Sequence, residues 1–153
     1  MFKQLRGLLS GGPYYVRFTK TRLTIRDAVS GEQFETGAKV GLDKDTRIVS
    51  VGDPVSSDAV RFVEPFSHPR IIISNFACAS KLLQYSIQQM SRIKWMLAAP
   101  ILILQPDMDL LAGLSEIETR VLLEMGENAG ARRTIAYYGA LLTDREVLAM
   151  VNA

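Results

Sequence analysis

The stretch YYVRFTKTRLTIR, residues 14–26, decides how the chain begins to fold. Its two ends, residues 14–18 and 22–26, are rich in the aromatic and β-branched residues that favour strands. Between them lies a short polar run, Thr19-Lys20-Thr21, which suits a tight connection. The pattern predicts two neighbouring antiparallel strands.

The same strand chemistry continues downstream. Two further runs, residues 33–42 and 46–51, are set off by turn-forming residues at 27–31 and 43–45. Together with the first pair they predict an antiparallel meander. Residues 52–69 contain three prolines, so we expect mostly loop there, with room for a helical turn near residues 56–60.

The second half of the chain alternates helices with strands. Ser74 or Asn75 can cap a helix that runs to about Ile93, and short buried strands are expected at residues 101–104 and 133–138. Capping boxes at residues 115–118 and 143–146 predict two more helices, the first ending near Gly130. The residues expected on the buried helix faces are Phe76, Leu82, Leu83, Ile87 and Met90, and then Ile117, Val121, Leu122 and Met125. A meander followed by β-α-β-α predicts an α/β domain with helices packed on a mixed sheet.

Composition excludes several classes of function. The formal net charge is only +2 and the basic residues are scattered, so we expect no nucleic-acid partner. The single cysteine, Cys78, and the single histidine, His68, cannot assemble a typical metal site, and one cysteine suits a reducing cytoplasm. The longest apolar run, residues 96–104, is broken by Pro100 and is too short to cross a bilayer.

Residues 1–9 have the pattern of a short amphipathic helix. Met1, Phe2, Leu5, Leu8 and Leu9 gather on one side of it, and Lys3 and Arg6 lie on its flanks. So short a helix is marginal alone in water and needs a surface, either the inner leaflet of a membrane or its own domain. Since residues 10–13 form a Gly- and Pro-containing joint, we divide the chain into a segment 1–12 and one domain, 13–153.

The order of these elements resembles the N-terminal half of the MreB family, the bacterial rod-shape-determining actins. MFKQLRGLLS (residues 1–10) is similar to that family's opening membrane-binding segment, and KVGLD (39–43) with SVGD (50–53) is similar to its passage into an A-V-G turn. PRIIISNF (69–76) with KLLQY (81–85) resembles its D-G-V-I-A-D-F and K-M-L motifs.

The later motifs also occur in the same order as in the family. PILILQP (100–106) resembles the family's P-R-V-V-I-C-V-P, and GLSEIETR (113–120) with AGAR (129–132) resembles its G-A-T-x-V-E-R-R and A-G-A-R. The resemblance covers nearly the whole chain and implies an actin-like (RNase H-like) subdomain.

The chain departs from the family where nucleotide would bind. In the family the first hairpin carries D-L-G-T-A-N-T, whose aspartate serves the metal ion and whose glycine admits the phosphates. The matching residues here are Val16, Arg17, Phe18, Thr19, Lys20, Thr21 and Arg22. Val16 takes the aspartate position and Phe18 the glycine position, and Asn75 replaces the aspartate of the helix-start motif. The second half of the family's fold has no counterpart in these residues, so the resemblance implies a degenerate phosphate position without cofactor or metal.

Several residues allow two interpretations. Glu118 matches a family glutamate near the attacking water, but it also completes the capping box with Ser115. Lys20 and Arg22 could bind an anion or form a solvated strand edge. His68 fits a plain loop residue and Cys78 a small core residue.

We therefore expect a non-catalytic MreB-like protein of the cell-shape cytoskeleton. Its partners would be an MreB-type filament or a second copy of itself, together with the inner membrane surface. The alternatives are a residual nucleotide- or anion-binding domain of the actin-like ATPase class, and a fragment whose role has drifted.

Overall fold

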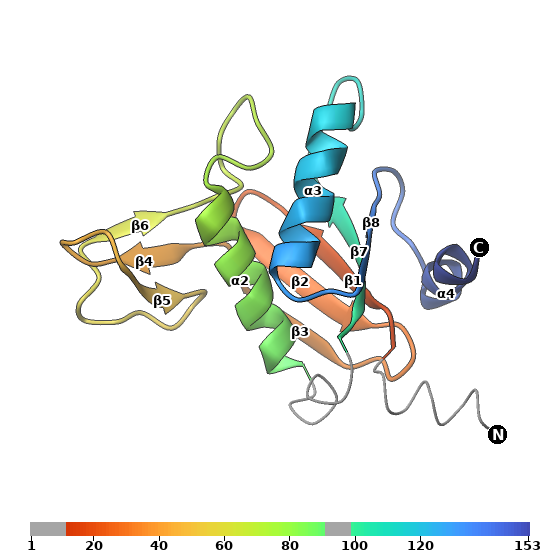
Figure 1. Ribbon diagram of the computed structural model, residues 1–153, viewed down its shortest axis with the longest axis horizontal. Coiled ribbons are helices and arrows are strands. Elements are labelled where there is room, and N and C mark those ends of the chain that lie inside the picture. The colour runs from red at the N-terminus through yellow and green to blue at the C-terminus, as the bar shows by residue number, and fades with distance from the viewer. Residues whose placement is uncertain (1–11, 91–98) are drawn as a thin grey trace.

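The computed structural model describes residues 12–90 and 99–153. A five-stranded mixed sheet forms its centre (Figure 1). The strands are β1 (Tyr14–Phe18), β2 (Arg22–Asp27), β3 (Gln33–Gly37), β7 (Ile101–Pro106) and β8 (Arg133–Ala136), in the order β3-β2-β1-β7-β8. The first three are antiparallel, whereas β7 and β8 run parallel to β1. The predicted α/β class with a mixed sheet is confirmed.

Helices lie on both faces of this sheet (Figure 1). Side chains alternate along a strand, so Val16 of β1 and Leu104 of β7 point to the face covered by α2 (Phe76–Gln89) and α3 (Glu116–Asn128). Tyr15 and Ile103 point to the other face, where α4 (Asp144–Asn152) contributes Val147. The larger core lies on the α2 and α3 side.

A second, three-stranded sheet corrects the predicted meander. The run at residues 33–42 was expected to be continuous, but it divides into β3 and β4 (Val40–Leu42), and β4 belongs to the smaller sheet. That sheet has the order β5-β4-β6, with β5 (Ile48–Val51) and β6 (Arg61–Val63) antiparallel to β4. Residues 52–69 are mostly loop, as expected, but they also contain the short strand β6, which the sequence did not predict and which pairs with β4.

The predicted helix starts are confirmed. Ser115 and Thr143 each begin a capping box, and the side chain of Asn75 accepts a hydrogen bond from the Cys78 N–H. Two predicted core residues are exposed instead: Phe76 and Ile117, which lie in the first turns of α2 and α3. Strand β8 ends at Ala136, two residues earlier than expected.

Of the remaining predictions for α2, one lies within the described residues and one extends beyond them. Cys78 is buried as expected, and burial raises the pKa of its thiol. Helix α2 ends at Gln89, and the predicted extension to Ile93 falls among residues 91–98, outside the described part.

Candidate functional site

The two residues that replace the family's nucleotide motif lie in the core. Val16 and Phe18 are both 0% exposed. The ring of Phe18 stacks on that of Phe66, with centroids 4.2 Å apart and planes inclined by 29°. Because side chains of this size fill a close-packed interior, neither position leaves room for a ligand.

The tip of the hairpin between β1 and β2 satisfies its own backbone. The Thr19 hydroxyl accepts hydrogen bonds from the N–H groups of Thr21 (3.3 Å) and Arg22 (3.0 Å). The Thr19 N–H donates to the Arg22 carbonyl at 2.8 Å. Three N–H groups that could have faced a phosphate are therefore turned to local partners.

The two cations of this hairpin have different surroundings. The Arg22 guanidinium bonds the carboxylates of Glu35 (3.0 Å) and Asp53 (3.4 Å), and the Glu35 hydrogen bond is the main reason its pKa is raised. Lys20 is exposed, and among residues 12–90 and 99–153 the structure shows no ion pair for it. Lys20 therefore keeps an unneutralised charge, whereas Arg22 is part of a local network.

A hollow of about 480 Å³ lies at the carboxyl ends of β1 and β7, where Lys20 faces residues from two other loops. Arg70 and His68 line it from the loop before α2, and Leu111 lines it from the loop after β7. This is the edge of an open α/β sheet at which ligands usually bind. The residues around the hollow combine exposed apolar side chains with charged ones of both signs, the cations Lys20 and Arg70 and the carboxylates Asp109 and Glu118.

Glu118 also lines this hollow, but its carboxylate is engaged. It accepts a hydrogen bond from the Ser115 N–H at 3.1 Å, and the Ser115 hydroxyl accepts one from the Glu118 N–H at 3.1 Å. The capping interpretation of Glu118 is therefore the one with geometric support. His68 is likewise occupied, since its Nδ1 accepts from the Arg70 N–H at 3.0 Å.

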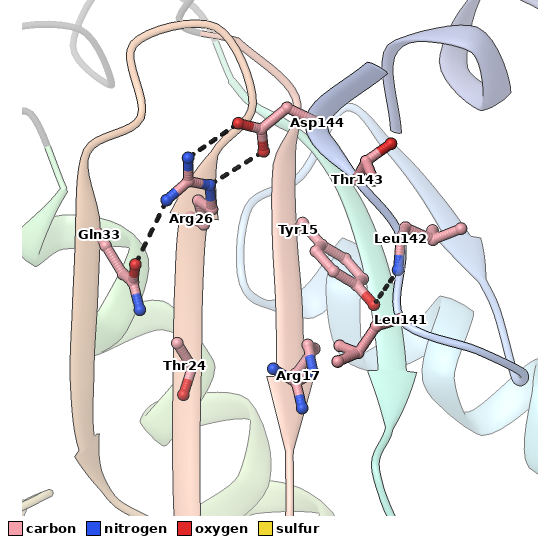
Figure 2. A pocket seen from close by; sticks show the side chains of 9 residues that line it. All are labelled: Tyr15, Arg17, Thr24, Arg26, Gln33, Leu141, Leu142, Thr143 and Asp144. Carbon is pink, nitrogen blue, oxygen red and sulfur yellow. Dashed lines mark hydrogen bonds and ion pairs between the residues drawn. The ribbon is translucent and has the colours of Figure 1, made fainter. Parts of the chain in front are cut away.

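A second hollow, of about 390 Å³, lies on the face of the sheet that α4 covers (Figure 2). Sequence reasoning missed it. Its floor consists of side chains from β1, β2 and β3, and its wall is the segment 141–144 before and into α4. The Tyr15 hydroxyl accepts a hydrogen bond from the Leu142 N–H at 3.2 Å, and Arg26 pairs with Asp144 (Figure 2). The alternation of Arg22, Thr24 and Arg26 along β2 was the available signal, because it marks a polar outer face.

The other sequence predictions concern the membrane and metals. The proposed membrane-contact residues, at positions 1–9, lie outside the described residues. Across residues 12–90 and 99–153 no helix is long and apolar enough to span a bilayer. In the same part of the chain, no three His, Cys, Asp or Glu side chains are grouped as metal ligands would be.

Comparison with solved structures places the fold. The chain is similar to MreB5 of Spiroplasma citri bound to ADP, with 16% identity and a TM-score of 0.59 over 82% of this chain and 38% of that one. It is also similar to a non-polymerising A278D mutant of MamK bound to AMPPNP, with 13% identity and a TM-score of 0.63 over 84% of this chain and 41% of that one. The AMPPNP-bound form of the S. citri protein gives 15% identity and a TM-score of 0.57.

These likenesses define the fold class: the chain has the fold of actin-like cytoskeletal proteins, as the order of its sequence motifs implied. It spans about two fifths of the length of the structures it matches. No family profile and no curated protein matches the sequence.

Proposed function

We propose that this chain is a non-catalytic, cytoskeleton-associated protein that acts by binding other proteins and the inner surface of the membrane. The observation that carries the proposal is the complete burial of Val16 and Phe18 at the positions where the actin-like resemblance implies a metal-side aspartate and a phosphate-side glycine. The neighbours with solved structures bind ADP or AMPPNP.

The chemistry of the hairpin supports this proposal. A phosphate group needs backbone or side-chain donors at about 2.7–3.2 Å, and it needs space to reach them. The Thr19, Thr21 and Arg22 N–H groups already have acceptors within the turn. A magnesium ion needs oxygen ligands, and Val16 offers none.

Exposed apolar residues beside the hollow supply a surface for a protein partner. Ile71 and Leu111 both line the hollow and are 49% and 108% exposed. Large apolar side chains grouped at one rim often mark an interaction surface. We assign the partner to the same class as the fold, either an actin-like filament or a second copy of this chain.

The membrane contact rests on residues 1–9. Their apolar side chains would enter the headgroup region, and Lys3 and Arg6 would attract anionic lipid. The protein would then lie at the cytoplasmic face of the inner membrane.

The test measures both contacts separately. The full chain and a variant lacking residues 1–9 are sedimented with anionic liposomes, and then with filaments of an actin-like protein from the same cells. We expect the deletion to abolish liposome binding and to leave filament binding intact. Unchanged liposome binding would reject the membrane contact, and absence of filament binding together with absence of self-association would reject the partner.

A residual anion- or nucleotide-binding domain is the second candidate. Its support is the charge on Lys20 and Arg70, which line one hollow and for which the described residues provide no ion pair. If this candidate is correct, sulfate and ATP should both perturb the NMR signals of these two residues, and the perturbation of Arg70 should disappear in Lys20→Ala. ATP without magnesium should then bind as well as ATP with it.

A further inference from the structure

Strand β5 differs from the other strand edges of the molecule. In the described residues the edges of the two sheets are β3, β8, β5 and β6. Three of them carry a charged side chain, namely Glu35 in β3, Arg133 in β8 and Arg61 in β6. Natural proteins use such charges to prevent edge-to-edge pairing. Strand β5, with the sequence Ile-Val-Ser-Val, carries none.

The backbone at the end of β5 is directed toward its free side. The Gly52 N–H donates to the Lys39 carbonyl at 2.8 Å, and Gly41 is opposite Ser50. Because antiparallel hydrogen bonds alternate, the N–H and C=O groups of Val51 point away from β4. No other strand pairs with this side among residues 12–90 and 99–153. One donor and one acceptor are thus available to an added strand.

A groove of about 470 Å³ runs along β5. Residues 54–56 and Tyr85 of α2 also line it, and β5 is an edge strand of the smaller sheet (Figure 1). None of the residues that line it is charged. The volume suits a few side chains of an extended peptide, and an unpaired charge placed there would lose hydration without gaining a partner.

We propose that β5 is a strand-addition site for an extended segment of a partner protein, which pairs antiparallel to β5 as a fourth strand of the smaller sheet and has no charged residue where it faces the groove. Main-chain hydrogen bonds supply the affinity and the groove selects apolar, β-branched side chains. Arg47 precedes β5, is exposed, and has no ion pair within the described residues, so the segment should end on an acidic residue opposite it. The inference rests on the proposed function in that the chain works by binding a protein.

The experiment uses the full chain and a synthetic probe, the fluorescein-labelled peptide Gly-Thr-Val-Thr-Val-Glu-Gly. A control peptide has proline in place of the central threonine, which removes a donor and disfavours pairing. The protein variants are Val49→Lys, which places a charge on β5, and Val60→Lys, a matched charge on a residue 68% exposed outside the groove. Fluorescence anisotropy reports binding, and amide exchange reports protection of the Val51 N–H.

We expect saturable binding of the probe, protection of Val51, and a loss of affinity of about tenfold or more in Val49→Lys but not in Val60→Lys. The proline peptide should not bind. Equal binding to both variants, or no binding of the probe at all, would overturn the site. Sedimentation showing that the free chain is a dimer that Val49→Lys dissociates would overturn the assignment to a partner segment, because the occupant would be a second copy. If filament binding persists while the probe does not bind, only this inference fails and the proposed function stands.

Discussion

The guanidinium group of Arg26 forms two hydrogen bonds to the carboxylate of Asp144, with Nε 2.9 Å from Oδ1 and Nη2 2.8 Å from Oδ2. This paired geometry connects β2 to the first turn of α4, which covers the second face of the sheet. The hydrogen bond from Arg26 also holds the pKa of Asp144 below its ordinary value of 3.8.

The pair predicts a stability contribution that depends on pH. Since the pKa of Asp144 is lower in the folded state, the contribution is present above the ordinary value of 3.8 and is lost as the pH falls through the folded pKa. Asp144→Asn should therefore be less stable than the wild type at neutral pH, and the difference should close in acid. Urea unfolding at several pH values measures this. Asp58→Asn, at an exposed carboxylate without an ion pair in the described residues, is the control, and a pH-independent difference for Asp144→Asn would contradict the account.

At Gly126 we predict that alanine lowers the stability of the protein, although helix propensity alone favours alanine. Alanine in a helix is usually more stable than glycine by about 1 kcal/mol. A Cβ at position 126, however, would lie 2.1 Å from the Thr134 Oγ1 and 2.9 Å from its Cβ, because α3 crosses β8 closely there. We expect Gly126→Ala to lower the free energy of unfolding, and Gly126→Ala with Thr134→Ala to recover only part of the loss, because alanine at position 134 removes the Oγ1 contact and keeps the Cβ. Stabilisation by the single change would show that the contact is looser than described.

Tyr14 predicts a loss of stability in alkali. Burial, and then the carboxylates of Asp27 and Glu32, raise the pKa of its hydroxyl from 10.0 to about 12. Between these values the unfolded chain has lost a proton that the folded protein retains, so stability is complete below pH 10 and falls as the pH rises toward 12. The slope is about 1.4 kcal/mol per pH unit. Tyr14→Phe should fall less steeply in denaturant melts across this range, and parallel curves for the two proteins would refute the assignment.

The capping role of Glu118 predicts that glutamine can replace it without loss of stability. Glutamine fills the same place in a capping box, so Glu118→Gln should keep the stability of the wild type. Glu118→Ala should lose about 0.5–1 kcal/mol, because the Ser115 N–H then loses its acceptor. Chemical denaturation followed by circular dichroism measures both. Equal losses in the two variants would mean that the negative charge, rather than the hydrogen bond, is what matters.

Local signals in the sequence predicted much of the fold. The capping boxes at Ser115 and Thr143 are local, since side chain and backbone meet within one turn, and both were correctly predicted. The aromatic and β-branched residues within residues 14–26 likewise predicted β1 and β2. These features need no knowledge of the rest of the molecule.

Features that depend on distant partners were not predictable in this way. Strand β6 contains only three residues and exists because β4 pairs with it. Ile117 has a helical apolar spacing, yet its side chain, in the first turn of α3, is 78% exposed. The replacement of a glycine by Phe18 was visible in the sequence, but Phe66, on which its ring stacks, was not. The hollow beside Arg26 also required the contact with Asp144, far along the chain.

The central claim is that the first hairpin is closed to nucleotide. Titration calorimetry of the full chain with ATP and magnesium tests it most directly, with Lys20→Ala as a comparison. We predict no saturable heat for either protein at millimolar nucleotide. Phe18 and Val16 occupy the space, and position 16 has no oxygen ligand for the metal. Stoichiometric binding with a micromolar Kd that depends on magnesium would contradict the account.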